Sequence, residues 1–224
     1  MSQPVKIDFV SDIACPWCAV GLRSLEEAMA RIEGLQVELH FHPFELNPQM
    51  GAEGEDAVEH LTRKYGISAE QAAENGEAIR ARGASLGFEF RMDQRRQVYN
   101  TFDAHRLLHW AGLQSQERQL ALKHALLRAY FSEGQNVSST EVLVRLANES
   151  GLDGERARML LATDEYVQAV RDQERFYSEQ GINAVPSVIL NDRHLIQGGQ
   201  PVEMFEQALR QVSGLAGTPD SAAH

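Results

Sequence analysis

The two cysteines of the chain, Cys15 and Cys18, lie two residues apart where a predicted strand meets a predicted helix. Residues 5–10 (VKIDFV) alternate and are mostly β-branched or aromatic, which is typical of a strand. Residues 16–32 carry apolar side chains at helical spacing and begin with a proline, which fits the first helical position because the N–H there has no partner. The sequence therefore predicts a dithiol that opens a helix directly after a strand.

β structure returns only after a long helical middle. Residues 36–42 are predicted to form a second strand, and residues 187–190 and 194–197 a hairpin around an Asn191–Asp192 turn. A final amphipathic helix is expected from Pro201 to Val212. The middle carries helical periodicity with capping residues and glycine stops, and its expected helices cover 56–65, 68–86, 97–110, 115–131, 139–148, 153–161 and 164–181.

This order of elements predicts an α/β thioredoxin fold, a βαβ unit followed by a ββα unit, with a large all-helical insertion. The thioredoxin-like domain is expected to be discontinuous, over residues 1–52 and 179–213, with the insertion at 53–178. Residues 214–224 are expected to form a disordered tail.

The position of the dithiol suits thiol–disulfide exchange. A thiolate is the attacking species, and the unpaired N–H groups and positive dipole end of a helix N-terminus stabilise it. Cys15 is therefore the predicted nucleophile, and Cys18, about one turn further, is expected to resolve the mixed disulfide. Val185-Pro186 directly precedes the third strand, where a cis-proline facing the dithiol is expected; a trans proline at a strand start is the simpler alternative.

The chain resembles the DsbA-like branch of the thioredoxin superfamily, and within it the FrnE-like subfamily. The resembling segments are SDIACPWCAVG (11–21), FHPFELNP (41–48), NTFDAHRLLHWA (100–111) and GINAVPSVIL (181–190). The resemblance implies that Cys15 and Cys18 are catalytic and that Pro186 is the cis-proline. Pro16, Trp17 and Val185 would support the active site.

Two departures limit what the resemblance implies. Periplasmic DsbA proteins carry His between the cysteines and a secretion signal, whereas this chain has Pro16-Trp17 and shows no signal, so strongly oxidising behaviour is not implied. The related 2-hydroxychromene-2-carboxylate isomerases and kappa-class glutathione transferases use serine where this chain has Cys15.

Other interpretations compete at individual residues. A structural disulfide between such close cysteines would stabilise little. A zinc site could combine the cysteines with His40 and His42, although zinc-binding CxxC turns usually form tight loops. Trp17 is expected to be an exposed aromatic that contacts substrate, rather than a ring packed on the helix. Asn100 and His105 could line a substrate cleft, or could cap a helix and pack in the core.

Charge and composition exclude other partners. The net charge is −11, which disfavours nucleic acid and anionic membranes, and no apolar run is long enough to span a bilayer. The sequence thus predicts a cytoplasmic thiol-disulfide oxidoreductase or isomerase that acts on protein or small-molecule disulfides. It needs no bound cofactor, because the two sulfurs carry the electrons, and glutathione is a candidate co-substrate. The alternative is a glutathione-dependent isomerase or transferase acting on a small molecule. The sequence does not indicate an oligomeric state.

Overall fold

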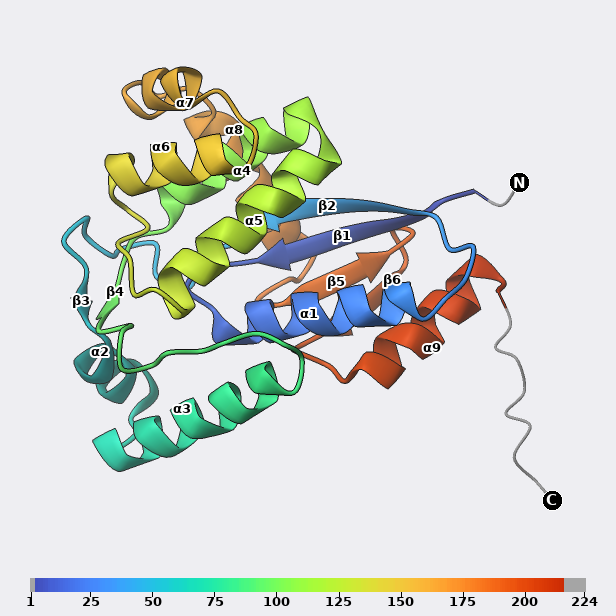
Figure 1. Ribbon diagram of the computed structural model, residues 1–224, viewed down its shortest axis with the longest axis horizontal. Coiled ribbons are helices and arrows are strands. Elements are labelled where there is room, and N and C mark those ends of the chain that lie inside the picture. Colours follow the sequence, from blue (N-terminus) through green and yellow to red (C-terminus); the bar gives the residue numbers. More distant parts are fainter. Residues whose placement is uncertain (1–2, 216–224) are drawn as a thin grey trace.

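A four-stranded mixed sheet lies at the centre of the computed structural model, which describes residues 3–215 (Figure 1). Its strands are β1 (Val5–Ser11), β2 (Val37–Pro43), β5 (Ser187–Leu190) and β6 (His194–Gln197), in the spatial order β2-β1-β5-β6. β1 runs parallel to β2 and antiparallel to β5, and β5 pairs antiparallel with β6. The parallel pair requires a crossover connection, which the helix that follows the dithiol provides.

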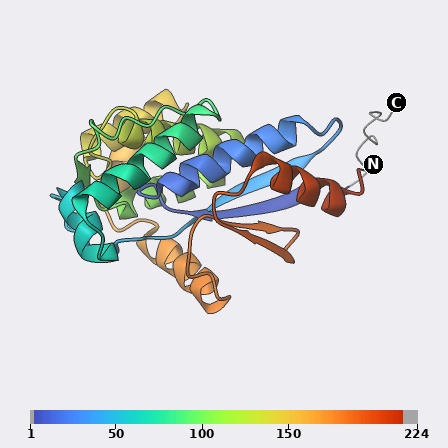
Figure 2. The same ribbon diagram turned by 90° about the horizontal axis from the view of Figure 1, so that it is seen from below.

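Helices cover both faces of this sheet. α1 (Pro16–Ala30) and α9 (Val202–Ser213) pack against each other on one face, and α8 (Val167–Glu179) lies on the opposite face (Figure 2). Under α8, Val10, Tyr177 and Ile182 form a small apolar cluster of their own. The βαβ and ββα units predicted from the sequence are therefore confirmed as a thioredoxin fold.

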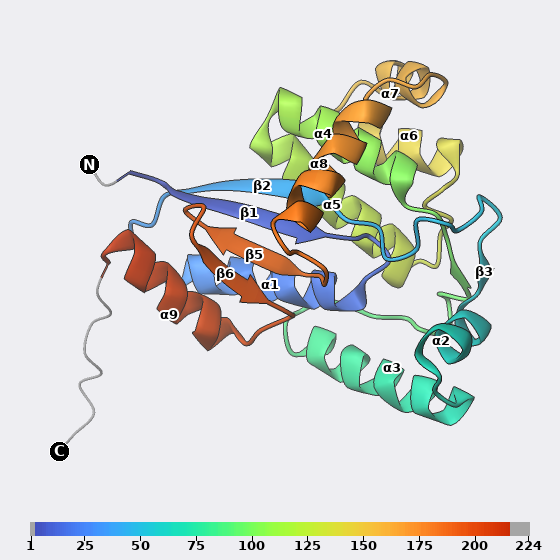
Figure 3. The ribbon, with the colours of Figure 1, turned by 180° about the vertical axis from the view of Figure 1, so that it is seen from behind.

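The helical insertion gathers at the end of the sheet where β1 and β2 terminate, and α3 reaches back beside α1 (Figure 3). Besides α8, its helices are α2 (Ala57–Tyr65), α3 (Ala69–Ala84), α4 (Phe102–Gln114), α5 (Gln116–Phe131), α6 (Thr140–Glu149) and α7 (Gly154–Leu161). α4 and α5 pack on β2, on the same face of the sheet as α1. The insertion therefore extends the core next to the dithiol helix.

The helix predicted at 97–110 differs most from the structure, where it extends to Gln114. The helix expected from Gln97 begins at Phe102, because Gln97–Val98 form a short strand, β4, that pairs with β3 (Glu55–Asp56). Val98 is buried there. The insertion thus contains a two-stranded ribbon as well as helices.

The C-terminal hairpin has the predicted turn. Asn191 and Asp192 have φ values of 50° and 55°, the left-handed conformation that a type I′ turn has at both central positions, and the Arg193 N–H donates to the Leu190 carbonyl at 3.1 Å. Gly214 ends α9, and of the predicted disordered tail residues 216–224 lie outside the described residues. Within residues 3–215, no helix combines the length and apolar character needed to cross a membrane.

Candidate functional site

The dithiol lies at the first turn of α1. Cys15 is the N-cap residue in an extended conformation, Pro16 is the first helical residue, and the Cys18 N–H donates to the Cys15 carbonyl at 3.1 Å. Both cysteines are free thiols. Cys15 retains 5% exposure and lines a cavity, whereas Cys18 is fully buried behind it. A partner can therefore reach Cys15 first, which is the order that the sequence predicts.

The environment shifts the two thiols in opposite directions. A hydrogen bond from the Cys18 thiol, aided by the backbone N–H groups of Cys18 and Trp17, lowers the pKa of Cys15 in spite of its burial. Burial raises the pKa of Cys18 well above its ordinary value, and the neighbouring Cys15 sulfur adds to this effect. Cys15 is thus favoured as the thiolate, and Cys18 holds its proton until Cys15 has reacted.

The segment before β5 faces the nucleophile. The Cys15 thiol donates to the Val185 carbonyl with a sulfur–oxygen distance of 3.6 Å. The Val185–Pro186 peptide bond is cis, as the sequence predicts. A Cβ atom added at Gly21 would lie 3.0 Å from Pro186 Cγ, so the glycine allows α1 and this segment to pack closely. The structure therefore brings together Cys15, Cys18, Val185 and Pro186.

Asp12, three residues before the nucleophile, carries no signal in the sequence that singles it out. Its buried carboxylate accepts hydrogen bonds from the Leu46 N–H at 2.7 Å and the Ala14 N–H at 3.3 Å, and His105 Nε2 lies 3.4 Å from it. Burial acts to raise the pKa of Asp12, but the hydrogen bonds from His105 and Leu46 bring it below its ordinary value. An ionised carboxylate therefore lies beneath the loop that carries Cys15.

A cavity of about 830 Å³ opens beside Cys15, between the start of α1 and helices α2 and α3 of the insertion. Trp17 lines it with 41% of its surface exposed, in agreement with the expectation of an exposed aromatic. Most of the remaining wall is apolar, and its charged side chains are Lys64, Arg95 and the ion-paired Glu77 and Arg80. A volume of this size is in the range of small-molecule sites.

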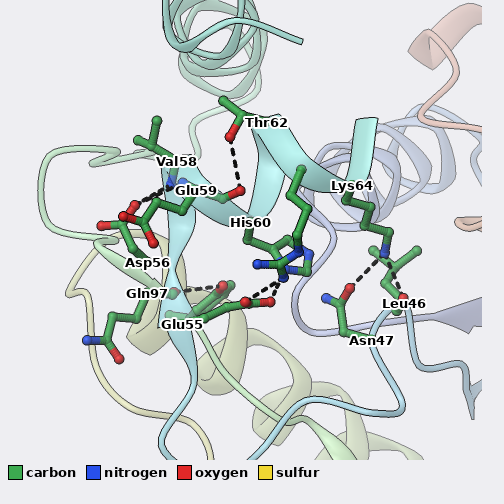
Figure 4. Close-up of polar contacts among 12 residues, drawn as sticks. Leu46, Asn47, Glu55, Asp56, Val58, Glu59, His60, Thr62, Lys64 and Gln97 are labelled. Carbon is green, nitrogen blue, oxygen red and sulfur yellow. Dashed lines mark hydrogen bonds and ion pairs between the residues drawn. The ribbon is translucent and has the colours of Figure 1, made fainter. Parts of the chain in front are cut away.

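Lys64 connects the cavity wall to the loop beneath the dithiol (Figure 4). Its Nζ donates to the Leu46 carbonyl and to Asn47 Oδ1, each at 2.7 Å. Leu46 is also the residue whose N–H binds Asp12. Nearby, Glu55 contacts His60 at the start of α2 (Figure 4) and also forms an ion pair with Arg63. The loop after β2 is thus held from both the thioredoxin side and the insertion side.

The other residues that the sequence suggested for the site do not line the cavity beside Cys15. Asn100 donates to the Met50 carbonyl at 2.9 Å and accepts from the Phe102 N–H at the start of α4, so it does not line the cavity. His105 also lies outside the cavity and approaches the dithiol from behind through Asp12. His42 binds Asp8 at 2.9 Å, away from the cysteines. Residues 3–215 contain no group of three or more His, Cys, Asp or Glu side chains arranged to hold a metal ion, so the zinc alternative has no gathered ligands.

Lys123 is a second buried charged group that the sequence did not predict. It lies on α5, is fully buried, and its Nζ has no hydrogen-bond partner within residues 3–215. The sequence does hold one signal for its burial, because Leu120, Leu126 and Leu127 lie three or four positions away and place Lys123 on an apolar helix face.

Comparison with known proteins agrees with this geometry. The family model for the DSBA-like thioredoxin domain matches residues 6–210. The uncharacterized protein YwbO of Bacillus subtilis is 30% identical over 92% of this chain and 96% of its own. The crystal structure of a probable DsbA oxidoreductase from Streptomyces coelicolor superposes with a TM-score of 0.86, at 35% identity, and covers 98% of this chain and 99% of that one.

A more distant likeness shows the fold alone. The cytosolic disulfide reductase DsbM of Pseudomonas aeruginosa, solved with glutathione, has a TM-score of 0.63 at 18% identity and covers 94% of this chain and 100% of that one. The family model and the more similar relatives each span nearly the whole chain. The chain therefore belongs to the DsbA-like thioredoxin family.

Proposed function

We propose that this protein is a thiol-disulfide oxidoreductase or isomerase that uses Cys15 and Cys18 to exchange with disulfides of proteins or small molecules. The observation that carries the proposal is the division between the two sulfurs. Cys15 has a lowered pKa and lines an open cavity, and Cys18 is buried behind it with a raised pKa. An attacking thiolate and a protected second thiol are what two-step exchange needs.

The reaction proceeds in two displacements. The Cys15 thiolate attacks one sulfur of a substrate disulfide, the substrate S–S bond breaks, and the first substrate thiolate leaves. Cys18 then loses its proton and attacks Cys15 Sγ, which forms the Cys15–Cys18 disulfide and releases the second substrate thiolate. The substrate is reduced by two electrons and the dithiol is oxidised, so no bound cofactor is needed. The reverse sequence oxidises a substrate dithiol.

The cavity supports a substrate that places apolar and anionic groups beside its disulfide. Trp17 and the apolar wall would contact the former, and Lys64 and Arg95 the latter. Glutathione has carboxylates and a thiol, so it is a candidate co-substrate, and the fold neighbour DsbM was solved with it. Exposed Trp17 at the rim would equally suit contact with a protein substrate.

The reduction potential of the Cys15–Cys18 pair tests the proposal. The protein is equilibrated in glutathione redox buffers, and its thiols are counted by alkylation and mass spectrometry. We expect one reversible two-electron transition, at a midpoint within the range of about −270 to −120 mV known for this fold. If the two cysteines never form an intramolecular disulfide, the proposal is wrong.

A second candidate is a glutathione-dependent isomerase or transferase, in which Cys15 activates glutathione and a small molecule is the substrate. The small-molecule size of the cavity favours it. Cys18→Ser separates the two functions, because it abolishes turnover when Cys18 must resolve a mixed disulfide and spares turnover when only Cys15 reacts. Turnover is measured with a disulfide substrate and, in parallel, with glutathione and an electrophile.

A further inference from the structure

The cavity beside Cys15 is bounded on one side by the hairpin that α2 and α3 form. Cavity-lining residues recur at three- and four-residue spacing along both helices, so one face of each helix is directed at the cavity. This face carries Ala57, Leu61 and Lys64 on α2 and Ala69, Ala72 and Gly76 on α3. Within α3 only Ala72 and Gly83 are buried, so the core does not cover this face. The hairpin therefore presents its inner wall to the space in front of the nucleophile.

Small side chains on α3 leave this space unfilled. A Cβ atom at Gly76 would have one neighbour within 4 Å outside its own helix, Met92 Cγ at 3.7 Å. The wall around it is apolar and includes Tyr65, Ile67 and Ile79. The cavity of about 830 Å³ thus has room for an apolar group, which is stabilised when it leaves water for this wall.

Two cations of the wall have no carboxylate partner within residues 3–215. Lys64 Nζ donates to two neutral oxygen atoms, the Leu46 carbonyl and Asn47 Oδ1 (Figure 4). Arg95 Nε donates to the Tyr130 hydroxyl at 3.1 Å, and its guanidinium lies 5.2 Å from the centre of that ring. The acidic side chain of the wall is bound to a third cation and does not neutralise them. In a chain with a net charge of −11, two such cations at one cavity favour an anionic ligand.

We infer that this cavity selects disulfides and thiols whose substituent joins an apolar body to a carboxylate. The inference rests on the dithiol function proposed above and names its substrate class. The substrate sulfur lies at Cys15, the apolar body contacts the inner face of α3, and the carboxylate pairs with Lys64 and Arg95. The reaction is the pair of displacements described above, so it needs no further reactant.

Glutathione fits this wall less well. Its carboxylates are attached to a polar peptide backbone, whose amide groups would lose water against the apolar side chains without gaining hydrogen-bond partners from them. The cavity therefore predicts that glutathione disulfide reacts more slowly than an apolar disulfide with a carboxylate, once their intrinsic reactivities are taken into account.

Stopped-flow oxidation of the reduced protein by three disulfides tests this selectivity. 5,5′-Dithiobis(2-nitrobenzoate) is aromatic and carries carboxylates, 4,4′-dithiodipyridine is aromatic and uncharged, and glutathione disulfide carries carboxylates without an apolar body. Each second-order rate constant is divided by that of 2-mercaptoethanol with the same disulfide, which removes differences in intrinsic reactivity. We expect the normalised constant for 5,5′-dithiobis(2-nitrobenzoate) to exceed the other two at least about tenfold.

Gly76→Leu tests the apolar part of the inference. The leucine side chain projects into the cavity, and replacing a glycine inside a helix favours helix formation. We expect the normalised constants for both aromatic disulfides to fall at least about fivefold, because the apolar body loses its contact surface. Alkylation of Cys15 by iodoacetamide should stay unchanged. Ala81→Leu is the matched control, since Ala81 is an exposed residue of the same helix that does not line the cavity.

The double variant Lys64→Gln/Arg95→Gln tests the anionic part and does not depend on the folding of Gly76→Leu. Glutamine keeps a hydrogen-bond donor and removes the charge. We expect the constant for 5,5′-dithiobis(2-nitrobenzoate) to fall about tenfold, because charge-assisted hydrogen bonds to its carboxylate are lost, and that for 4,4′-dithiodipyridine to stay within about twofold. Arg91→Gln/Arg96→Gln is the control, since both arginines are exposed and lie outside the cavity.

Three outcomes overturn the inference: equal normalised constants for the three disulfides, no effect of Gly76→Leu, or a double variant that slows both aromatic disulfides equally. The last would mean that the two cations change the ionisation of Cys15 and not the binding of substrate. Failure of the dithiol function has a different signature. The wild type would then release one thiolate per 5,5′-dithiobis(2-nitrobenzoate) and form no Cys15–Cys18 disulfide, whatever its selectivity.

Discussion

Replacing Lys123 with methionine should stabilise the protein at neutral pH and cease to do so at alkaline pH. Methionine has nearly the length of the lysine side chain and keeps the contact with Phe41, but it removes the buried ammonium. The substitution therefore isolates the free energy that folding spends on burying this charge. Most core substitutions are destabilising, so the opposite sign is informative.

The magnitude follows from the change in the pKa of Lys123 on folding. This pKa falls from 10.5 to about 8, and a tenfold change in proton affinity corresponds to about 1.4 kcal/mol, so the whole change amounts to about 3 kcal/mol. Between these two pKa values the unfolded chain binds more protons than the folded protein, so wild-type stability rises with pH through this window. Lys123→Met should exceed the wild type by about 3 kcal/mol at pH 7 and by about zero near pH 10.5.

Urea unfolding of both reduced proteins at several pH values from 7 to 10.5 measures this difference. Titratable groups that do not interact with Lys123, such as Tyr130, cancel in the comparison. Lys6→Met serves as the control, because Lys6 is half-exposed and its ion pairs contribute at most about 1 kcal/mol. The reasoning is refuted if Lys123→Met destabilises the protein by the same amount at every pH, since the ammonium would then be well solvated or paired in the folded state.

Four further substitutions test the site and the packing of the helices around it. Asp12→Asn should lower the free energy of unfolding, measured in urea at pH 7, by about 1–3 kcal/mol, because an amide cannot satisfy the N–H donors around it. The difference between variant and wild type should become smaller below about pH 4, because the pKa of Asp12 is lowered and the wild type loses stability as Asp12 is protonated. Gly83→Ala should lower the free energy of unfolding by about 1–3 kcal/mol, because the new Cβ would lie 2.3 Å from the Phe90 side chain. Gly76→Ala on the same helix has no comparable clash and should raise the free energy of unfolding by up to about 1 kcal/mol. Trp17→Ala should raise the KM for an aromatic disulfide about three- to tenfold with little change in kcat, and an unchanged KM would remove Trp17 from the binding surface.

The parts of the site that the sequence predicted are those set by local order along the chain. Cys15 and Cys18 are placed by a strand, a short loop and a proline-initiated helix, and each of these has its own local signal. Val185-Pro186 was placed because it directly precedes a strand of the hairpin. Local signals suffice for these residues because each lies at the end of a strand or helix that the sequence itself marks.

Local signals failed where packing between distant segments decides the outcome. Gln97–Val98 became a strand only because Glu55–Asp56, some forty positions earlier, lies beside it. Asn100 was placed near the cleft by resemblance, but its partner is the Met50 carbonyl. The burial of Lys123 over Phe41 depends on how α5 packs on β2, which periodicity does not specify.

The position of these missed groups bears on what the helical insertion does. The thioredoxin part supplies both sulfurs, Asp12 and Pro186, whereas Lys123, His105 and Lys64 come from residues 53–178. If the insertion only shaped the substrate cavity, its side chains would lie on the open side of Cys15, as Lys64 does. Lys123 and His105 instead approach from the buried side, where no substrate reaches. The insertion therefore supplies buried side chains behind the dithiol as well as part of the wall of the cavity in front of Cys15.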